Sequence, residues 1–215
     1  MKITIYLFGD SITRGSFDTE SSGWADRIKA EANIKTVNNE LEPLITVYNM
    51  GIGGNNTNDL LKRFKFETEQ RLVRDSEIYF LFSFGTNDSA IYANTGEHAI
   101  NIDQYAKNIR QVIAEAKEYS KNILFLTSPP VIDEITKKVS SIGKSRLNSD
   151  IIKYNNILIS ICSDLNIELV DIYKLFLEQG DYRKLYYDDG VHPNSDGHKL
   201  IFNAVRDYYI HKNIM

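Results

Sequence analysis

Residues 78–84, Ile-Tyr-Phe-Leu-Phe-Ser-Phe, form the most continuous apolar run in the sequence. Apolar side chains on both faces are typical of a central strand in a parallel sheet, where helices cover both sides. Working outward from this run, we find four more short apolar segments and several stretches with helical spacing. We expect further strands at 3–8, 45–50, 123–127 and 167–170, and helices at 24–34, 57–74, 102–119, 145–165 and 195–209.

The alternation of these segments predicts the fold class. Strands separated by helices of ten or more residues form βαβ units and a parallel sheet. Five strands in this pattern predict an α/β fold, a three-layer α/β/α sandwich of flavodoxin-like type with a mostly parallel sheet. No linker, repeat or low-complexity tract interrupts the chain, so a single domain is expected over residues 1–215. The polar segment 133–149 is expected to be a long surface loop.

Composition narrows the classes of function. The chain is 42% apolar and 25% charged, with a net charge of −4. This is ordinary for a soluble globular protein and unfavourable for a nucleic-acid partner, which requires a basic face. The single cysteine, Cys162, excludes an internal disulfide and a metal site built from several cysteines.

The apolar segments are short. The first is too short for a secretory signal, and none approaches the ~20 apolar residues needed to span a membrane. We therefore expect a cytoplasmic protein with no membrane span. The sequence carries no sign of the oligomeric state.

Four polar, glycine-rich segments follow predicted strands or precede the last predicted helix. They are Gly-Asp-Ser at 9–11, Asn-Met-Gly-Ile-Gly-Gly at 49–54, Gly-Thr-Asn-Asp at 85–88 and Asp-Gly-Val-His-Pro at 189–193. In open parallel sheets, ligands bind beyond the C-terminal ends of the strands. The fold would bring these segments to one edge of the sheet, and we expect the functional site there.

These segments contain the residue types of nucleophilic catalysis. Ser11 directly follows a strand, and its hydroxyl needs a base before it can attack. An unperturbed imidazole titrates near neutral pH, which suits His192 to that role, and Asp189 can accept the other ring N–H. The backbone N–H groups of Ser11 and Gly54 and the side-chain amide of Asn87 are suitable donors to an oxyanion.

The same four segments resemble the sequence blocks of the SGNH hydrolases, also called the GDSL esterase/lipase family. They occur in the family's order over residues 9–193, with Gly-Asp-Ser-Ile where the family name has Leu in fourth place. The resemblance implies a flavodoxin-like fold and the hydrolysis of carboxylic esters or thioesters. The substrate would be a small molecule, and the reaction would need no cofactor or metal. The resemblance implies Ser11 as nucleophile and His192 with Asp189 as base and orienting acid. It also implies Ser11, Gly54 and Asn87 as the oxyanion hole.

For two of the site roles, a neighbouring residue is an alternative candidate. Asp188 adjoins Asp189, and the family's Asp-x-x-His spacing is what selects Asp189. Gly51 and Gly53 lie beside Gly54, and each can serve a tight turn instead. Cys162 lies on an apolar helix face and is expected to be a buried structural thiol.

The substrate class stays open. Lysophospholipids, acyl thioesters, short acyl or acetyl esters and acetylated sugars share one set of catalytic residues, so a carbohydrate O-acetylesterase is an alternative. Two alternatives belong to other classes. One is a metal-dependent phosphodiesterase with Asp10, Asp88, Asp189 and His192 as ligands, and the other is a non-catalytic carbohydrate- or lipid-binding module.

Substrate specificity is expected in the loops around the site. These loops are 17–24, 88–102, 133–149 and 180–188. Their aromatic residues can form a sugar platform or an acyl groove, although ordinary packing explains each of them equally well: Phe17, Trp24, Tyr92, Tyr182, Tyr186 and Tyr187.

Overall fold

The computed structural model describes residues 1–39 and 41–214. Five parallel strands form the central sheet in the order β2-β1-β3-β5-β7. Their bounds are β1 (Lys2–Gly9), β2 (Leu44–Gly51), β3 (Ser76–Ser83), β5 (Asn122–Leu126) and β7 (Glu168–Val170). This order is the flavodoxin-like, doubly wound arrangement, and the predicted fold class is confirmed.

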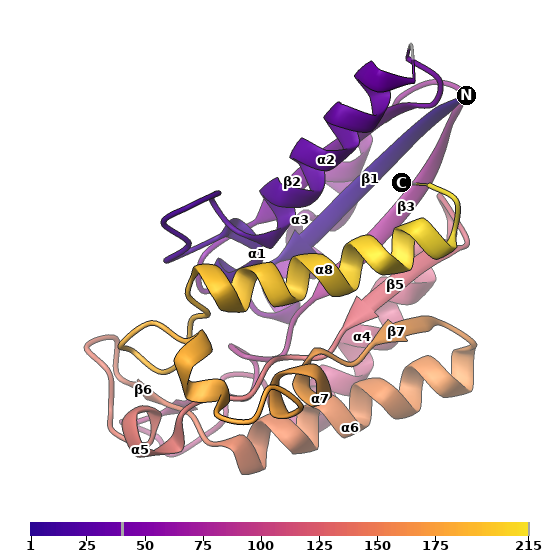
Figure 1. The fold of residues 1–215 in the computed structure, drawn as a ribbon. Coiled ribbons are helices and arrows are strands. Elements are labelled where there is room, and N and C mark those ends of the chain that lie inside the picture. Colours follow the sequence, from indigo (N-terminus) through magenta and orange to yellow (C-terminus); the bar gives the residue numbers. More distant parts are fainter. Residues whose placement is uncertain (40, 215) are drawn as a thin grey trace.

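Helices cover both faces of the sheet (Figure 1). One face packs against α2 (Trp24–Asn38) and α8 (Ser195–His211). The other packs against α3 (Thr57–Glu69), α4 (Ile102–Lys117) and α6 (Asn148–Leu165). The shorter helical elements include α1 (Ser11–Arg14), α7 (Ile172–Leu177) and the 3-10 helix η1 (Tyr182–Leu185).

The alternation of side chains along each strand builds the two layers of core. Successive residues of a strand point to opposite faces of the sheet. In β3, Leu81 belongs to the core under α2 and α8, whereas Phe80 and Phe82 belong to the core under α3, α4 and α6. All three are at most 1% exposed. The apolar run is therefore buried on both faces, as its composition predicts.

The helix predicted over 57–74 ends five residues early, at Glu69. The carbonyl of Arg71 accepts a hydrogen bond of 2.7 Å from the Tyr6 hydroxyl on the sheet. This contact holds the chain against the sheet two residues after the helix ends, on the way to β3.

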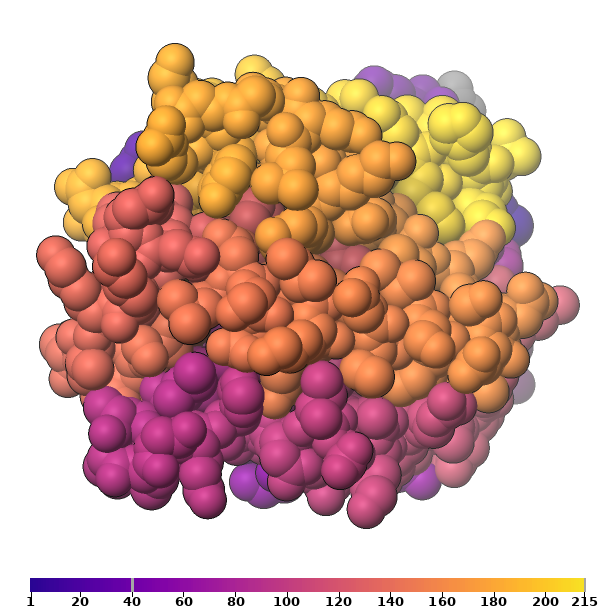
Figure 2. Space-filling view, turned by 90° about the horizontal axis from the view of Figure 1, so that it is seen from below, coloured from indigo at the N-terminus to yellow at the C-terminus, as the bar shows by residue number. Residues whose placement is uncertain are grey.

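The segment 133–149 is more ordered than the predicted surface loop. It begins with α5 (Asp133–Thr136) and continues as β6 (Lys144–Ser145), which pairs antiparallel with β4 (Ile91–Tyr92). Figure 2 shows this segment, in salmon, beside the magenta residues that include β4. Because β6 is extended, α6 begins at Asn148 and the predicted start at 145 is wrong.

None of the helices formed by the described residues is long and apolar enough to cross a bilayer.

Candidate active site

The site lies at the C-terminal edge of the sheet, where β1 and β3 end side by side. Gly9 at the end of β1 pairs with Ser83 at the end of β3. The strand order changes direction between these two strands, which is where doubly wound folds bind ligands. Asp10 caps α1 by accepting the Ile12 N–H at 2.8 Å. Ser11 is therefore the first residue of α1 and stands at the edge of the sheet.

The structure brings Ser11, His192 and Asp189 into one hydrogen-bonded chain. The Ser11 Oγ lies 2.8 Å from His192 Nε2, and His192 Nδ1 lies 2.6 Å from Asp189 Oδ2. The other carboxylate oxygen, Asp189 Oδ1, accepts the backbone N–H groups of Val191 at 2.9 Å and His192 at 3.0 Å. In this order, an imidazole can take the serine proton while the carboxylate holds the ring tautomer.

The charge state of Asp189 suits that arrangement. Burial alone raises the pKa of Asp189, but the hydrogen bonds from His192 and Val191 outweigh it and lower the pKa below its usual value. Asp189 is thus ionised at neutral pH and able to stabilise an imidazolium. The rival Asp188 is exposed and has no side-chain hydrogen bond to any part of the chain that the structure describes.

The three expected oxyanion donors line one cavity with the hydrogen-bonded chain. Among the described residues, the backbone N–H groups of Ser11 and Gly54 have no hydrogen-bond partner. The Asn87 Nδ2 donates to Asp10 Oδ2 at 3.2 Å and to the Asn55 carbonyl at 3.1 Å. Both distances lie at the upper end of the normal range for an N–H···O bond, and an oxyanion in the cavity could compete for these hydrogens.

Glycine is required at positions 54 and 51 for different physical reasons. Gly54 has φ +79°, a left-handed conformation that glycine adopts without strain, and a Cβ there would meet no protein atom within 4 Å. At Gly51, a Cβ would lie 2.2 Å from the Arg14 backbone nitrogen, so this glycine lets α1 approach β2. Gly51 does not line the cavity of the site, whereas Gly54 does.

The cavity has a volume of about 680 Å³. Its outer wall comes from the segment 133–146, where Ile135, Val139 and Ile142 present apolar side chains. On the other side, the Phe17 ring stacks on Tyr187 with centroids 4.2 Å apart and leans against the His192 ring at 5.0 Å. The site therefore joins the polar catalytic groups to the apolar wall of Ile135, Val139 and Ile142. The same segment also lines the cavity with polar and charged side chains, namely Lys138, Ser140, Ser141 and Lys144.

Most of the six aromatic residues considered as substrate contacts do not line the cavity. Trp24 is fully buried at the start of α2, and Tyr186 is 7% exposed in the same core. The Tyr182 hydroxyl donates to the Val131 carbonyl, and the ring of Tyr92 lies under the Lys144 ammonium. Phe17 is the one of the six that lines the cavity, with Tyr187 stacked behind it.

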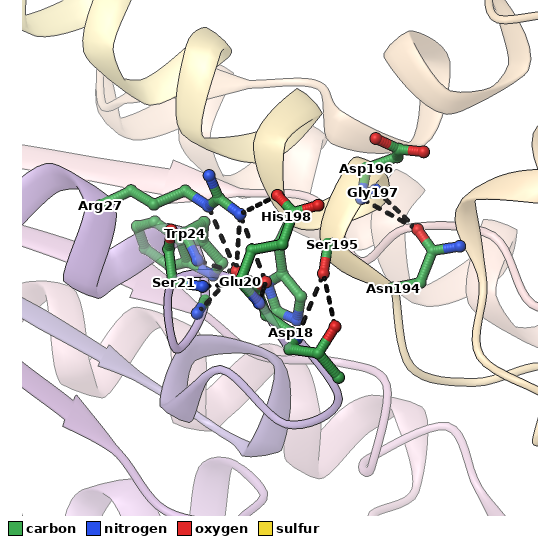
Figure 3. Close-up of polar contacts among 12 residues, drawn as sticks. Asp18, Glu20, Ser21, Trp24, Arg27, Asn194, Ser195, Asp196, Gly197 and His198 are labelled. Carbon is green, nitrogen blue, oxygen red and sulfur yellow. Dashed lines mark hydrogen bonds and ion pairs between the residues drawn. The ribbon is translucent and has the colours of Figure 1, made fainter.

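The buried side chain of His198 connects α8 to the loop after α1 and to the start of α2, which the sequence analysis does not predict. This side chain is fully buried at the start of α8. Its Nε2 faces the Ser16 carbonyl at 3.0 Å. Its Nδ1 faces the Trp24 N–H at 3.4 Å, and Figure 3 labels both of these residues. Burial lowers the pKa of His198, and a neutral ring with its proton on Nε2 satisfies both contacts. No local pattern signals these contacts, because both partners lie more than 170 residues away.

Asp18 ties the loop that carries Phe17 to α2. Its carboxylate accepts the backbone N–H groups of Glu20 and Gly23 at 2.9 Å each and pairs with Arg27 at 3.0 Å (Figure 3). Burial alone raises the pKa of Asp18, but these hydrogen bonds lower it well below its usual range. The ion pair is well shielded, with side-chain exposures of 0% for Asp18 and 14% for Arg27.

Replacing Asp18 by asparagine is expected to lower the free energy of unfolding at pH 7 by about 2 kcal/mol. The folded protein favours the ionised carboxylate, so its folded pKa lies below the unfolded value. The stabilisation is therefore complete above the unfolded pKa of about 3.9 and is lost as the pH falls below it. Denaturant unfolding at pH 7 and pH 3 measures the difference between the two proteins. An equal difference at both pH values would contradict the ionic contribution.

The acidic residues weighed as metal ligands have contacts within the fold. Asp10 caps α1, and Asp88 Oδ1 accepts the N–H of Thr57 at 2.9 Å and its hydroxyl at 2.5 Å. Burial raises the pKa of Asp88 to about 6. Within residues 1–39 and 41–214, no three histidine, cysteine, aspartate or glutamate side chains are grouped to hold a metal ion. Cys162 is buried, which raises its pKa to about 12 and fits the expected structural thiol.

Comparison with known sequences gives matches over nearly the whole chain. The profile of the GDSL-like Lipase/Acylhydrolase family matches residues 7–200. A GDSL esterase/lipase of Arabidopsis thaliana is 28% identical over 217 residues, which cover 95% of this chain and 84% of that protein. The human isoamyl acetate-hydrolyzing esterase 1 homolog is 25% identical over 214 residues, which cover 93% of this chain and 78% of that protein.

Solved structures share the fold. A lipase/acylhydrolase from Enterococcus faecalis superposes with a TM-score of 0.77 at 22% identity, covering 98% of this chain and 96% of that one. The acetyl xylan esterase Axe2 from Geobacillus stearothermophilus gives a TM-score of 0.71 at 21% identity, covering 95% and 93%. Axe2 has also been solved in forms described as catalytic mutants, in which a serine, an aspartate or a histidine is replaced by alanine.

Proposed function

The chain belongs to the GDSL-like lipase/acylhydrolase family, and from this premise we propose that it hydrolyses small carboxylic esters through an acyl-enzyme on Ser11. One observation carries the proposal: the unbroken chain of contacts from the Ser11 hydroxyl through His192 to Asp189, at 2.8 and 2.6 Å. The same three residue types are changed in the catalytic mutants of Axe2, which supports the assignment.

In the proposed mechanism, the Ser11 Oγ bonds to the acyl carbon while His192 Nε2 takes its proton. The negative oxygen of the tetrahedral intermediate is stabilised by the N–H groups of Ser11 and Gly54 and by the Asn87 amide. Collapse of the intermediate breaks the bond to the alcohol, which leaves with the proton from His192. A water molecule, activated by His192, then releases the carboxylic acid and restores Ser11. These steps need no cofactor.

The walls of the cavity and the names of the relatives favour acetyl or short acyl esters with an apolar part. Ile135, Val139 and Ile142 face a space large enough for a small molecule beyond the reacting carbonyl. The related esterases are named for isoamyl acetate and acetyl xylan, both of them acetyl esters. The apolar wall favours an aliphatic alcohol over a sugar as the leaving group.

We expect isoamyl acetate to be hydrolysed with a kcat/KM about ten-fold or more above that of ethyl acetate. Its three additional carbons can be buried against the apolar wall, and each buried CH₂ contributes up to ~0.8 kcal/mol. Initial rates from pH-stat titration measure the ratio, and the variant Val139→Ser should reduce it. Equal rates for both esters would contradict the proposed alcohol site.

The alternatives predict different outcomes in the same assay. Faster hydrolysis of acetylated xylo-oligosaccharides than of isoamyl acetate would favour a carbohydrate O-acetylesterase. Chelator-sensitive hydrolysis of a phosphodiester would favour the metal-dependent phosphodiesterase, whereas the serine mechanism is insensitive to a chelator.

A single domain over residues 1–215 and a cytoplasmic location stay predictions.

A further inference from the structure

Arg146 is a buried arginine that lines the cavity of the site, and the proposed mechanism does not use it. It follows β6 and is only 6% exposed. Its guanidinium donates from Nε to the Thr86 carbonyl at 3.1 Å and from Nη2 to Asn87 Oδ1 at 2.8 Å. Its backbone is bound on both sides to Thr136, through the N–H and the carbonyl. Burying a cation costs free energy unless hydrogen bonds and opposite charges compensate for the water it loses.

The contact determines which way the Asn87 amide points. A guanidinium has donors and no acceptor, so the oxygen of the amide must face Arg146. The Nδ2 then faces the opposite side, where Asp10 Oδ2 and the Asn55 carbonyl accept its hydrogens. The amide is thus held from both ends, and Asn87 lines the same cavity as Ser11. A charged donor on the oxygen also polarises the amide and strengthens its N–H groups as donors.

The positive charge of Arg146 also affects the electrostatics around the Asn87 amide. Asp10 is buried beside the Asn87 amide, and its carboxylate would oppose a negative oxygen developing there. Burial raises the pKa of Asp10 and lowers the pKa of Arg146, while the charge of each partly restores the ionised form of the other. The guanidinium therefore offsets the charge of the buried Asp10 carboxylate, which contacts the expected oxyanion donor Asn87.

We propose that Arg146 is a positioning residue for the reaction, which orients and polarises the Asn87 amide for the oxyanion. This inference rests on the proposed function, because it assumes that Asn87 stabilises the tetrahedral intermediate. It adds a contribution from the segment 133–146, which lies outside the four polar, glycine-rich segments of the sequence. That segment then shapes both the apolar wall and the oxyanion hole.

A double-mutant cycle tests the inference. Asn87→Ala is expected to lower kcat by about 10²–10³-fold, and Arg146→Met by about 10- to 100-fold, the value of a charged hydrogen bond. In both variants KM should stay within about threefold of the wild type, because the interaction strengthens in the transition state. If Arg146 acts through Asn87, adding Arg146→Met to Asn87→Ala should change kcat by less than about threefold.

Control variants separate positioning from folding. Arg71→Met removes a half-buried arginine that donates to the Glu67 carbonyl at 2.9 Å, away from the site, and should leave kcat unchanged. Arg146→Lys keeps the charge but not the pair of hydrogen bonds, and should lose less activity than Arg146→Met. If Arg146→Met does not fold, the same cycle is run with Arg146→Lys.

The outcomes are distinct. An equal loss in both backgrounds would mean that Arg146 acts independently of Asn87 and would overturn the inference. A rise in KM at constant kcat would indicate a contact with bound substrate and would overturn it as well. If the wild type is active and Asn87→Ala is equally active, the inference is overturned, whereas the serine mechanism stands. A wild type that hydrolyses no ester would overturn the proposed function and this inference together.

Discussion

Replacing Ser11 by alanine is expected to lower kcat/KM for ester hydrolysis by about 10⁴-fold or more. The variant lacks the atom that would form the acyl-enzyme, while the cavity and the backbone donors remain. The hydroxyl makes a hydrogen bond of 2.8 Å to His192 and caps no helix, because Asp10 supplies the cap of α1. The thermal midpoint of unfolding should therefore stay close to that of the wild type.

Covalent labelling gives a second readout of the same variant. A fluorophosphonate should add one adduct to Ser11 in the wild type and none in Ser11→Ala, as measured by intact mass and peptide mapping. Ser160→Ala, on the exposed side of α6, is the matched control and should be labelled and active like the wild type. An active Ser11→Ala protein would contradict the mechanism. An unlabelled, inactive wild type would favour a binding module.

Replacing Asp189 by asparagine is expected to lower kcat/KM by about 10³–10⁴-fold. Two backbone N–H groups, from Val191 and His192, contact Oδ1 and would hold the amide oxygen there. The new NH₂ group would then face His192 Nδ1 and force the ring proton onto Nε2. In that tautomer, Nε2 cannot accept the proton of Ser11.

The neighbouring residue provides the control for this prediction. Asp188→Asn makes the same chemical change one position away, on an exposed side chain. Its kcat/KM should stay within about threefold of the wild type, and the ratio of the two variants measures how far the role belongs to Asp189. Comparable losses in both variants would mean that the two carboxylates share the function.

The four polar segments were predictable because their signals are local. Gly9-Asp10-Ser11 and Gly85-Thr86-Asn87-Asp88 each follow an apolar strand directly, and parallel strands place such segments at one edge of the sheet. The Asp-x-x-His spacing is equally local, since a turn of four residues brings Asp189 Oδ2 to His192 Nδ1. Composition and order along the chain predicted these segments, and the resemblance to the family selected Asp189 over Asp188.

The outer wall of the cavity was not predictable in the same way. Residues 133–149 are polar and lack a clear period, and their order comes from pairing two residues of β6 with two of β4. So short a ladder leaves no alternation to recognise. The contact of Arg146 with Asn87 spans 59 residues, and one arginine among the 25 basic residues carries no mark of its partner.

The fold class and the residue types of the site followed from the amino-acid sequence, because strand burial, helix spacing and turn chemistry act between near neighbours. Which side chains share the site depended on the tertiary structure. Trp24 and Tyr186 turn into the core, whereas Phe17, Ile135 and Arg146 reach the cavity. The physical reason is that a side chain's burial and partners are set by the packing of elements far apart in the chain, which no local pattern encodes.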